Sequence, residues 1–238
     1  MKGSVFLALD FPVLEQAKDF IEQNELQGVP VKVGMELFYR EGLPLIDWLK
    51  RNNHEIFLDL KLHDIQTTVK RAMKNLAVLG VDMVNVHALG GSDMIKAARE
   101  GLAAGSAAGH NPKLIAVTIL TSMENHVMNN ELGLQGSIQN NTVHLSNLAY
   151  ESGADGVVCA VHEAGAIKKV CGPSFLTVTP GIRLLNAAGD DQKRIATPAV
   201  ARKNGSDILV VGRTVTNAQN PKIAYEEVKK EWSHGEKS

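Results

Sequence analysis

Short apolar runs and amphipathic segments alternate along the chain, and this alternation restricts the possible folds more than any other feature. The runs are rich in Val, Ile and Leu without strict polar alternation, as expected of parallel strands that are covered on both faces. The intervening segments carry apolar residues at steps of three or four, as amphipathic helices do. The apolar runs are 5–9, 29–34, 56–60, 81–87, 114–120, 155–161, 175–180 and 207–212. The predicted helices are 13–24, 36–52, 65–79, 92–104, 140–152, 162–170 and 192–204.

Eight strand–helix units in alternation predict a parallel sheet with right-handed crossovers. Eight strands also close a (β/α)8 barrel, and 238 residues is a typical length for that fold. We therefore predict an α/β protein with a single domain over 1–238, a (β/α)8 TIM barrel, and keep a doubly wound open sheet as the alternative. We find no internal repeat, and we expect left-handed helix caps at Gly80, Gly153 and Gly205.

The composition argues against several classes of protein. Hydrophobic residues make up 44% of the chain and charged residues 21%, as in ordinary soluble domains. A formal net charge of −1 gives no indication of a nucleic-acid partner or an acidic membrane surface. Cys159 and Cys171 are too few for a disulfide framework or a zinc site. No signal peptide and no uncharged run of membrane-spanning length is evident, so we expect a cytoplasmic protein with no membrane partner.

Polar and charged residues follow the predicted strands. In a (β/α)8 barrel the reacting groups lie at the C-terminal ends of the strands. Those positions hold Asp10, Lys32, Asp59, Lys61, His87, Thr121, Ser122, Arg183, Gly212 and Arg213. Such a set, converging on one barrel mouth, indicates an active site.

The stretch FLDLKLHDI, 57–65, holds the densest group of charges. Asp59 and Lys61 are two residues apart on a strand and should share a face, with Leu60 turned toward the helices. Asp64 comes where the next helix begins, so one alternative for it is a helix N-cap. For all three charged residues, the alternative is a structural salt-bridge cluster. A lysine between two carboxylates keeps its proton and can serve as a positioned proton donor.

The motifs TPGIR and VVGRTV indicate a phosphate site. Gly212 can offer a backbone N–H and Arg213 a guanidinium fork to a phosphate. Barrels often bind phosphate in the loops after strands seven and eight, and Arg183 belongs to the neighbouring loop. Gln192 could add a donor. The alternative is a simple turn with a surface arginine.

Two long loops, 121–136 and 184–191, follow the fifth and seventh runs. Loops of this length in a compact barrel are often lids, and the alternative is a tolerated surface insertion. The histidines show no metal-ligand spacing, so we predict no metal site. Neither a GxGxxG nor a GxxxxGK[ST] motif is present, so no dinucleotide or P-loop site is predicted.

Taken together, these motifs resemble the orotidine 5′-phosphate decarboxylase family. The resemblance is carried by LALDF, VKVGMELFY, FLDLKLHDIQTTV, VNVHALGG, FLTVTPGIR, DDQKRIATP and VVGRTVT, which span nearly the whole chain. It implies decarboxylation of orotidylate to UMP, the last step of de novo UMP synthesis, with no metal, flavin or pyridoxal cofactor. It also implies a homodimer with shared active sites.

The resemblance further implies a role for each group of residues. Asp10 and Lys32 would hold the ribose hydroxyls. Asp59, Lys61 and Asp64 would form a charged array beside the reacting C6 carbon, with Lys61 protonating C6. Asp64 and Thr68 would come from the partner subunit. Thr121 and Ser122 would lie near the pyrimidine, and the 5′-phosphate would be held by Arg183, Gln192, Gly212 and Arg213.

Three other functions remain open at this stage. A Mg²⁺-dependent sugar-phosphate decarboxylase of the same barrel superfamily also carries an Asp-x-Lys-x-x-Asp pattern. A Schiff-base aldolase would need Lys61 as a neutral amine, which flanking carboxylates disfavour. A catalytically silent nucleotide-binding barrel would keep the phosphate site but would have no use for the three charged residues together.

Overall fold

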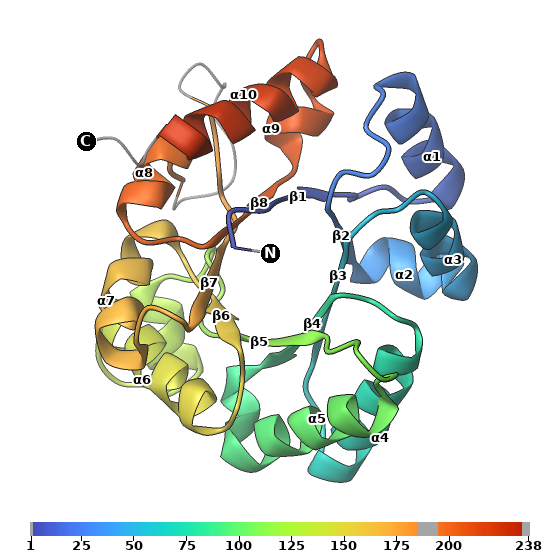
Figure 1. The fold of residues 1–238 in the computed structure, drawn as a ribbon. Coiled ribbons are helices and arrows are strands. Elements are labelled where there is room, and N and C mark those ends of the chain that lie inside the picture. The colour runs from blue at the N-terminus through green and yellow to red at the C-terminus, as the bar shows by residue number, and fades with distance from the viewer. Residues whose placement is uncertain (1, 185–194, 235–238) are drawn as a thin grey trace.

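Eight parallel strands form a closed barrel in the computed structural model, which describes residues 2–184 and 195–234. Neighbouring strands in the chain pair with each other, and β1 (Val5–Ala8) pairs with β8 (Ile208–Val211) to close the sheet. Figure 1 shows this ring of strands with the helices arranged around its outside. The predicted (β/α)8 barrel is confirmed, and the open-sheet alternative is wrong.

The other strands follow the predicted apolar runs, with small shifts at their ends. They are β2 Val31–Gly34, β3 Ile56–Leu62, β4 Met83–His87, β5 Lys113–Val117, β6 Gly156–Val158 and β7 Leu176–Thr179. The fifth run is predicted to continue to Leu120, but β5 ends at Val117, and Ile119 and Leu120 line a cavity instead of pairing with β6.

The helices cover the outer face of the barrel (Figure 1). They are α1 Leu14–Gln23, α2 Met35–Glu41, α3 Leu43–Arg51, α4 Gln66–Val78, α5 Gly91–Gly105, α6 Ile138–Glu151, α7 Val161–Cys171, α8 Pro198–Lys203, α9 Arg213–Thr216 and α10 Pro221–His234. Short turns of 3-10 and π helix span Ala88–Gly90 and Val127–Glu131. Within the described residues, no helix is both long and apolar enough to cross a membrane.

Two of the predicted helices need correction, and one helix is missing from the prediction. The helix predicted over 36–52 is two helices, because Gly42 adopts a φ of +59° between them. The helix predicted over 192–204 begins at Pro198, whose fixed φ suits the first helical position, and 192–194 lie outside the described residues. Helix α10 is absent from the predicted elements, although it buries Tyr225, Val228 and Trp232 at helical spacing.

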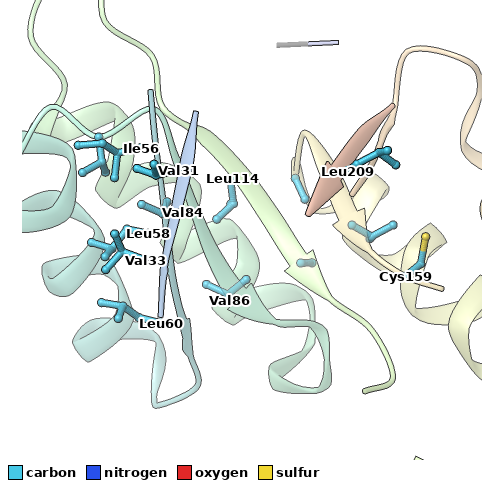
Figure 2. Close-up of a cluster of buried hydrophobic side chains, with 14 of the residues drawn as sticks. Val31, Val33, Ile56, Leu58, Leu60, Val84, Val86, Leu114, Cys159 and Leu209 are labelled. Carbon is cyan, nitrogen blue, oxygen red and sulfur yellow. The ribbon is translucent and has the colours of Figure 1, made fainter. Parts of the chain in front are cut away.

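Alternate strand residues pack into two separate apolar layers. Figure 2 shows Ile56, Leu58 and Leu60 on one side of β3, in the large cluster between the sheet and the helices. A second cluster fills the barrel interior, where Phe6 meets Phe57 edge to face with ring centroids 6.1 Å apart. Because this cluster occupies the early residues of the strands, it leaves room for a cavity only toward their C-terminal ends.

A short Gly-x-Asp turn recurs before β4, β6 and β8, at the end of the barrel opposite the strand C-termini. Its glycines, Gly80, Gly153 and Gly205, have positive φ, as predicted. Each aspartate two positions later accepts a backbone hydrogen bond from the preceding strand. The pairs are Asp82 with Ile56 N–H, Asp155 with Leu114 N–H and Asp207 with Thr177 N–H, at 2.8 to 2.9 Å. The prediction of no internal repeat therefore misses this motif, which is too short to stand out in the sequence.

Candidate active site

A cavity of about 250 Å³ opens at the C-terminal end of the barrel strands. Apolar side chains, including Phe57, Val117 and Val158, form part of its lining. The rest of the lining includes most of the residues predicted at the mouth, namely Asp10, Lys32, Asp59, Lys61, Thr121, Arg183, Gly212 and Arg213. The fold thus brings residues from seven of the eight strands, or from the loops that follow them, to one site.

Four charged side chains of the cavity alternate in sign, and we call them the charged array: Asp10, Lys32, Asp59 and Lys61. Lys32 Nζ lies 2.8 Å from Asp10 Oδ1 and 3.7 Å from Asp59 Oδ2. Asp59 Oδ1 lies 2.8 Å from Lys61 Nζ. The side chains of Lys32 and Asp59 are 11% and 13% exposed, so the middle of the array is shielded from water and its two ends are more open.

Lys61 reaches the cavity through an irregularity in β3. Leu58 pairs with Val84 of β4, and the next pair is Leu62 with Val86. Between these pairs β3 advances from 58 to 62 while β4 advances only from 84 to 86, so β3 carries two extra residues. Lys61 itself has a φ of +52°, a left-handed conformation that is uncommon for residues with a side chain. Asp59 and Lys61 do face the same cavity, but regular strand alternation is not the reason.

Asn85 of β4 supports this irregular stretch and is absent from the predicted site residues. Its side chain is buried, with 1% exposure. Asn85 Oδ1 accepts a hydrogen bond from the Lys61 backbone N–H at 2.7 Å, and Nδ2 donates one to Asp59 Oδ1 at 2.6 Å. The available sequence signal was a carboxamide in the centre of the apolar run VDMVNVH.

Asp64 and Thr68 do not line the cavity of their own chain, although the sequence groups them with the site. Both lie in the exposed stretch 63–68. Among the described residues, Asp64 forms no ion pair with Lys61; its carboxylate accepts a hydrogen bond from the Ile65 N–H at 2.6 Å. The N-cap of α4 is Ile65, so the alternative role of Asp64 as the N-cap is wrong.

The predicted phosphate residues lie at the ends of β7 and β8. Arg183 is buried and donates from Nη1 to the Ile182 carbonyl at 2.8 Å and toward Thr214 Oγ1 at 3.4 Å. Thr214 Oγ1 in turn donates to the same carbonyl at 2.7 Å, which ties the two strand ends together. Arg213 is exposed at the start of α9. The position of Gln192 and most of the predicted lid 184–191 lie outside the described residues.

The loop after β5 contributes one of its two predicted residues to the lining. Thr121 lines the cavity, whereas Ser122 is exposed and does not. Farther along the predicted lid 121–136, Met128 in the π-helical turn is fully buried in the main apolar cluster. The middle of this loop is therefore packed against the barrel.

Comparison with known proteins decides what kind of barrel this is. Residues 3–228 match the model of the orotidine 5′-phosphate decarboxylase / HUMPS family. The chain belongs to this family. The resemblance carried by the sequence motifs is thereby confirmed.

Relatives agree with this membership of the orotidine 5′-phosphate decarboxylase family. The chain is 55% identical over 233 residues to the orotidine 5′-phosphate decarboxylase of Bacillus pumilus, covering 98% of this chain and 100% of the relative. The corresponding protein of Bacillus cytotoxicus is 51% identical, with 98% of each chain covered. The crystal structure of the orotidine 5′-phosphate decarboxylase from Lactobacillus acidophilus matches with a TM-score of 0.87 and 44% identity, covering 98% of this chain and 99% of that one.

Two histidines flank the site in this member of the orotidine 5′-phosphate decarboxylase family. The rings of His63 and His87 stack with centroids 5.6 Å apart. Burial lowers the pKa of His87, and the neighbouring His63 and Lys61 lower it further. Within the described part of the chain, no three His, Cys, Asp or Glu side chains come together in a group that could hold a metal ion.

Proposed function

We propose that this chain converts orotidylate to UMP and CO₂, with Lys61 as the proton donor and without a metal or an organic cofactor. Family membership and the names of the relatives support the decarboxylation. The mechanism rests on the position of Lys61, whose ammonium group reaches the cavity at the end of the charged array, 2.8 Å from Asp59.

The lining of the cavity supports a nucleotide that lies across the barrel mouth. The 5′-phosphate is held at the β7 and β8 end by Arg183, Gln192, Gly212 and Arg213. The ribose hydroxyls bind Asp10 and Lys32 on β1 and β2, and the pyrimidine lies beside Lys61, with Thr121 and Ser122 near its edge. In this arrangement each polar part of the substrate meets a complementary group of the lining.

The reaction needs a cation at one carbon atom. When the bond between C6 and the carboxylate breaks, its electron pair stays on C6, in the plane of the ring, where no adjacent carbonyl can delocalise it. An ammonium group beside C6 stabilises this charge and then transfers its proton to C6, which yields UMP and a neutral amine. Because the charge forms during the reaction, the interaction stabilises the transition state more than the bound substrate.

We also propose a homodimer in which Asp64 and Thr68 complete the partner's site. Both residues are exposed and lie outside the lining of their own cavity, as such an exchange requires. Apolar side chains are exposed beside them at the ends of three neighbouring strands: Met35 at 42%, Ile65 at 73% and Leu89 at 37%. A two-fold interface over this rim would bury these side chains and make the exchange reciprocal.

The remaining proposals concern the chain as a whole. We propose that residues 1–238 form one barrel domain, which the family match over 3–228 supports. We propose that the protein is located in the cytoplasm, which is a reducing environment. Cys159 and Cys171 are free thiols, which suits that compartment. Cell fractionation would test the location.

The absorbance change on mixing orotidylate with the purified protein tests the activity directly. We expect turnover that EDTA leaves unchanged. Activity that disappears with EDTA and returns with Mg²⁺ would instead support a metal-dependent sugar-phosphate decarboxylase. Tight UMP binding without turnover would support a silent nucleotide-binding barrel.

A further inference from the structure

Asn85 lies beneath the charged array and does not line the cavity, whereas Asp59 and Lys61 do. With 1% exposure it is cut off from solvent and from the space that a ligand could occupy. Its side chain nevertheless makes one hydrogen bond to each of these two residues. It can therefore influence a reaction in the cavity only through Asp59 and Lys61.

The bond to Lys61 replaces strand pairing. In a regular ladder the backbone N–H of Lys61 would pair with a carbonyl of the neighbouring strand, but the two extra residues of β3 interrupt the ladder here. Asn85 Oδ1 accepts this N–H instead, at 2.7 Å. A non-glycine residue holds a left-handed conformation only where its surroundings fix it, and this bond is one such restraint on Lys61.

The bond to Asp59 sets the direction of its carboxylate. Asp59 Oδ1 receives two donors, Asn85 Nδ2 at 2.6 Å and Lys61 Nζ at 2.8 Å. A carboxamide provides one acceptor and one donor group, so it satisfies the Lys61 N–H and the Asp59 carboxylate at once. An ionised carboxylate at position 85 could only accept, and an aliphatic side chain could do neither.

We infer that Asn85 is a positioning residue of the decarboxylation: it holds the Lys61 backbone and the Asp59 carboxylate so that the Lys61 ammonium lies beside C6 of the substrate. This inference rests on the proposed role of Lys61 as the proton donor. Loss of the Asn85 amide should displace the donor and leave the phosphate and ribose contacts in place. The effect should therefore fall on kcat and not on nucleotide binding.

Two variants test this assignment. In N85A, kcat should fall about 100-fold, the scale expected when a reacting group is displaced by about 1 Å. KM and the UMP dissociation constant should change less than about threefold, because Asn85 does not line the cavity and its loss removes no contact with the bound nucleotide. Steady-state kinetics and calorimetric UMP titration give these values.

N85D is the sharper test, because it is nearly isosteric and its effect depends on pH. The ionised carboxylate lacks a donor for Asp59, whereas the protonated acid has one O–H donor and one carbonyl acceptor, as the amide does. Burial and the charge of Asp59 raise the pKa of the introduced carboxyl, while the ammonium groups of Lys61 and Lys32 oppose that rise. The ratio of kcat for N85D to wild type should rise by about tenfold or more from about pH 8 to about pH 5.5 as this acid protonates.

S146A is the matched control. Ser146 is another fully buried polar residue, with a hydroxyl that donates to the Thr142 carbonyl at 2.7 Å within α6, and it does not line the cavity. S146A should lose some stability in thermal unfolding but keep the wild-type kcat and pH profile. An N85D ratio that stays flat with pH, or folded Asn85 variants with kcat like that of S146A, would overturn the positioning role. Wild-type protein without orotidylate turnover would contradict the proposed function instead.

Discussion

Lys61 Nζ lies 2.8 Å from Asp59 Oδ1, and the two side chains remain 29% and 13% exposed beside the cavity. Each charge is partly shielded from water, so each depends on the other for compensation. A cation held in this way stays in a fixed place while the substrate binds, which is the requirement for stabilising charge that forms on one atom. The variants below test the separate parts of this arrangement.

Replacing Lys61 by alanine should abolish decarboxylation and leave UMP binding largely unchanged. We expect kcat to fall by about 10⁴-fold or more, the upper range for the loss of a general acid. UMP affinity should change far less, because the ammonium acts mainly on charge that forms in the transition state. The control is K113A, which breaks an ion pair with Asp155 outside the cavity. Substantial turnover by K61A would rule out Lys61 as the donor.

Replacing Arg213 by alanine should weaken the binding of ligands that carry a phosphate and of no others. The expected loss in UMP binding is about 1.5–3 kcal/mol, the scale of a hydrogen bond to a charged group. Binding of uridine, which has no phosphate, should stay the same. R51A, at an exposed position in the last turn of α3, is the control. Equal losses for UMP and uridine would show that Arg213 is structural.

Mixed dimers test the exchange of Asp64. K61A and D64A proteins should each be nearly inactive alone. After they are unfolded and refolded together in equal amounts, roughly half of the dimers should be mixed and roughly a quarter of all sites should regain both residues, by two-fold symmetry. Activity near that level supports a shared site. If activity does not return after subunit exchange has been demonstrated, Asp64 acts in the active site of its own chain.

Two histidines, the buried His54 and the half-buried His87, should make the fold less stable in mild acid. Burial lowers the pKa of His54, although its hydrogen bond to the Val29 carbonyl partly opposes this, and burial also lowers the pKa of His87. The unfolded chain binds protons near pH 6.5, where the folded histidines remain neutral, so stability is complete above about pH 6.5 and falls as the pH drops below it. Urea unfolding at several pH values measures this slope.

The variant H54F should reduce that slope. Phenylalanine keeps an aromatic ring stacked on Trp48, where the present centroid distance is 5.9 Å, but it cannot be protonated. The lost hydrogen bond to Val29 should cost about 1 kcal/mol at neutral pH. H144N, at an exposed position of α6, should keep the wild-type slope. An unchanged slope in H54F would show that His54 does not contribute to acid sensitivity.

Much of the fold could be predicted because each element carries its own apolar period. Strand order and barrel closure followed from the number and alternation of elements. The break at Gly42 was not recognised, because both flanking segments continue the same helical pattern. Helix α10 was missed for a different reason: its charged residues outnumber the apolar ones that it buries.

The types of site residue were predictable because polar side chains stand out at the ends of apolar strands. Their distances were not, since they depend on contacts between strands. The left-handed turn at Lys61 is supported by a hydrogen bond that its backbone N–H donates to Asn85, a residue 24 positions later. The burial of Arg183 against Ile182 and Thr214 likewise could not be predicted, because it depends on how the ends of β7 and β8 pack together.

The positive-φ glycines at the rim opposite the mouth show where this barrel holds extra chain. They stand before the even-numbered strands at 28, 80, 153 and 205, the last three in Gly-x-Asp turns, so two intervals are 52 residues long and the middle one is 73. The longer interval contains 118–137, the connection from β5 to α6 at the mouth. An interval can thus lengthen by 21 residues without altering the turn that closes it. New loops, and with them new specificities, can be added at the mouth while the opposite rim keeps the strands in register.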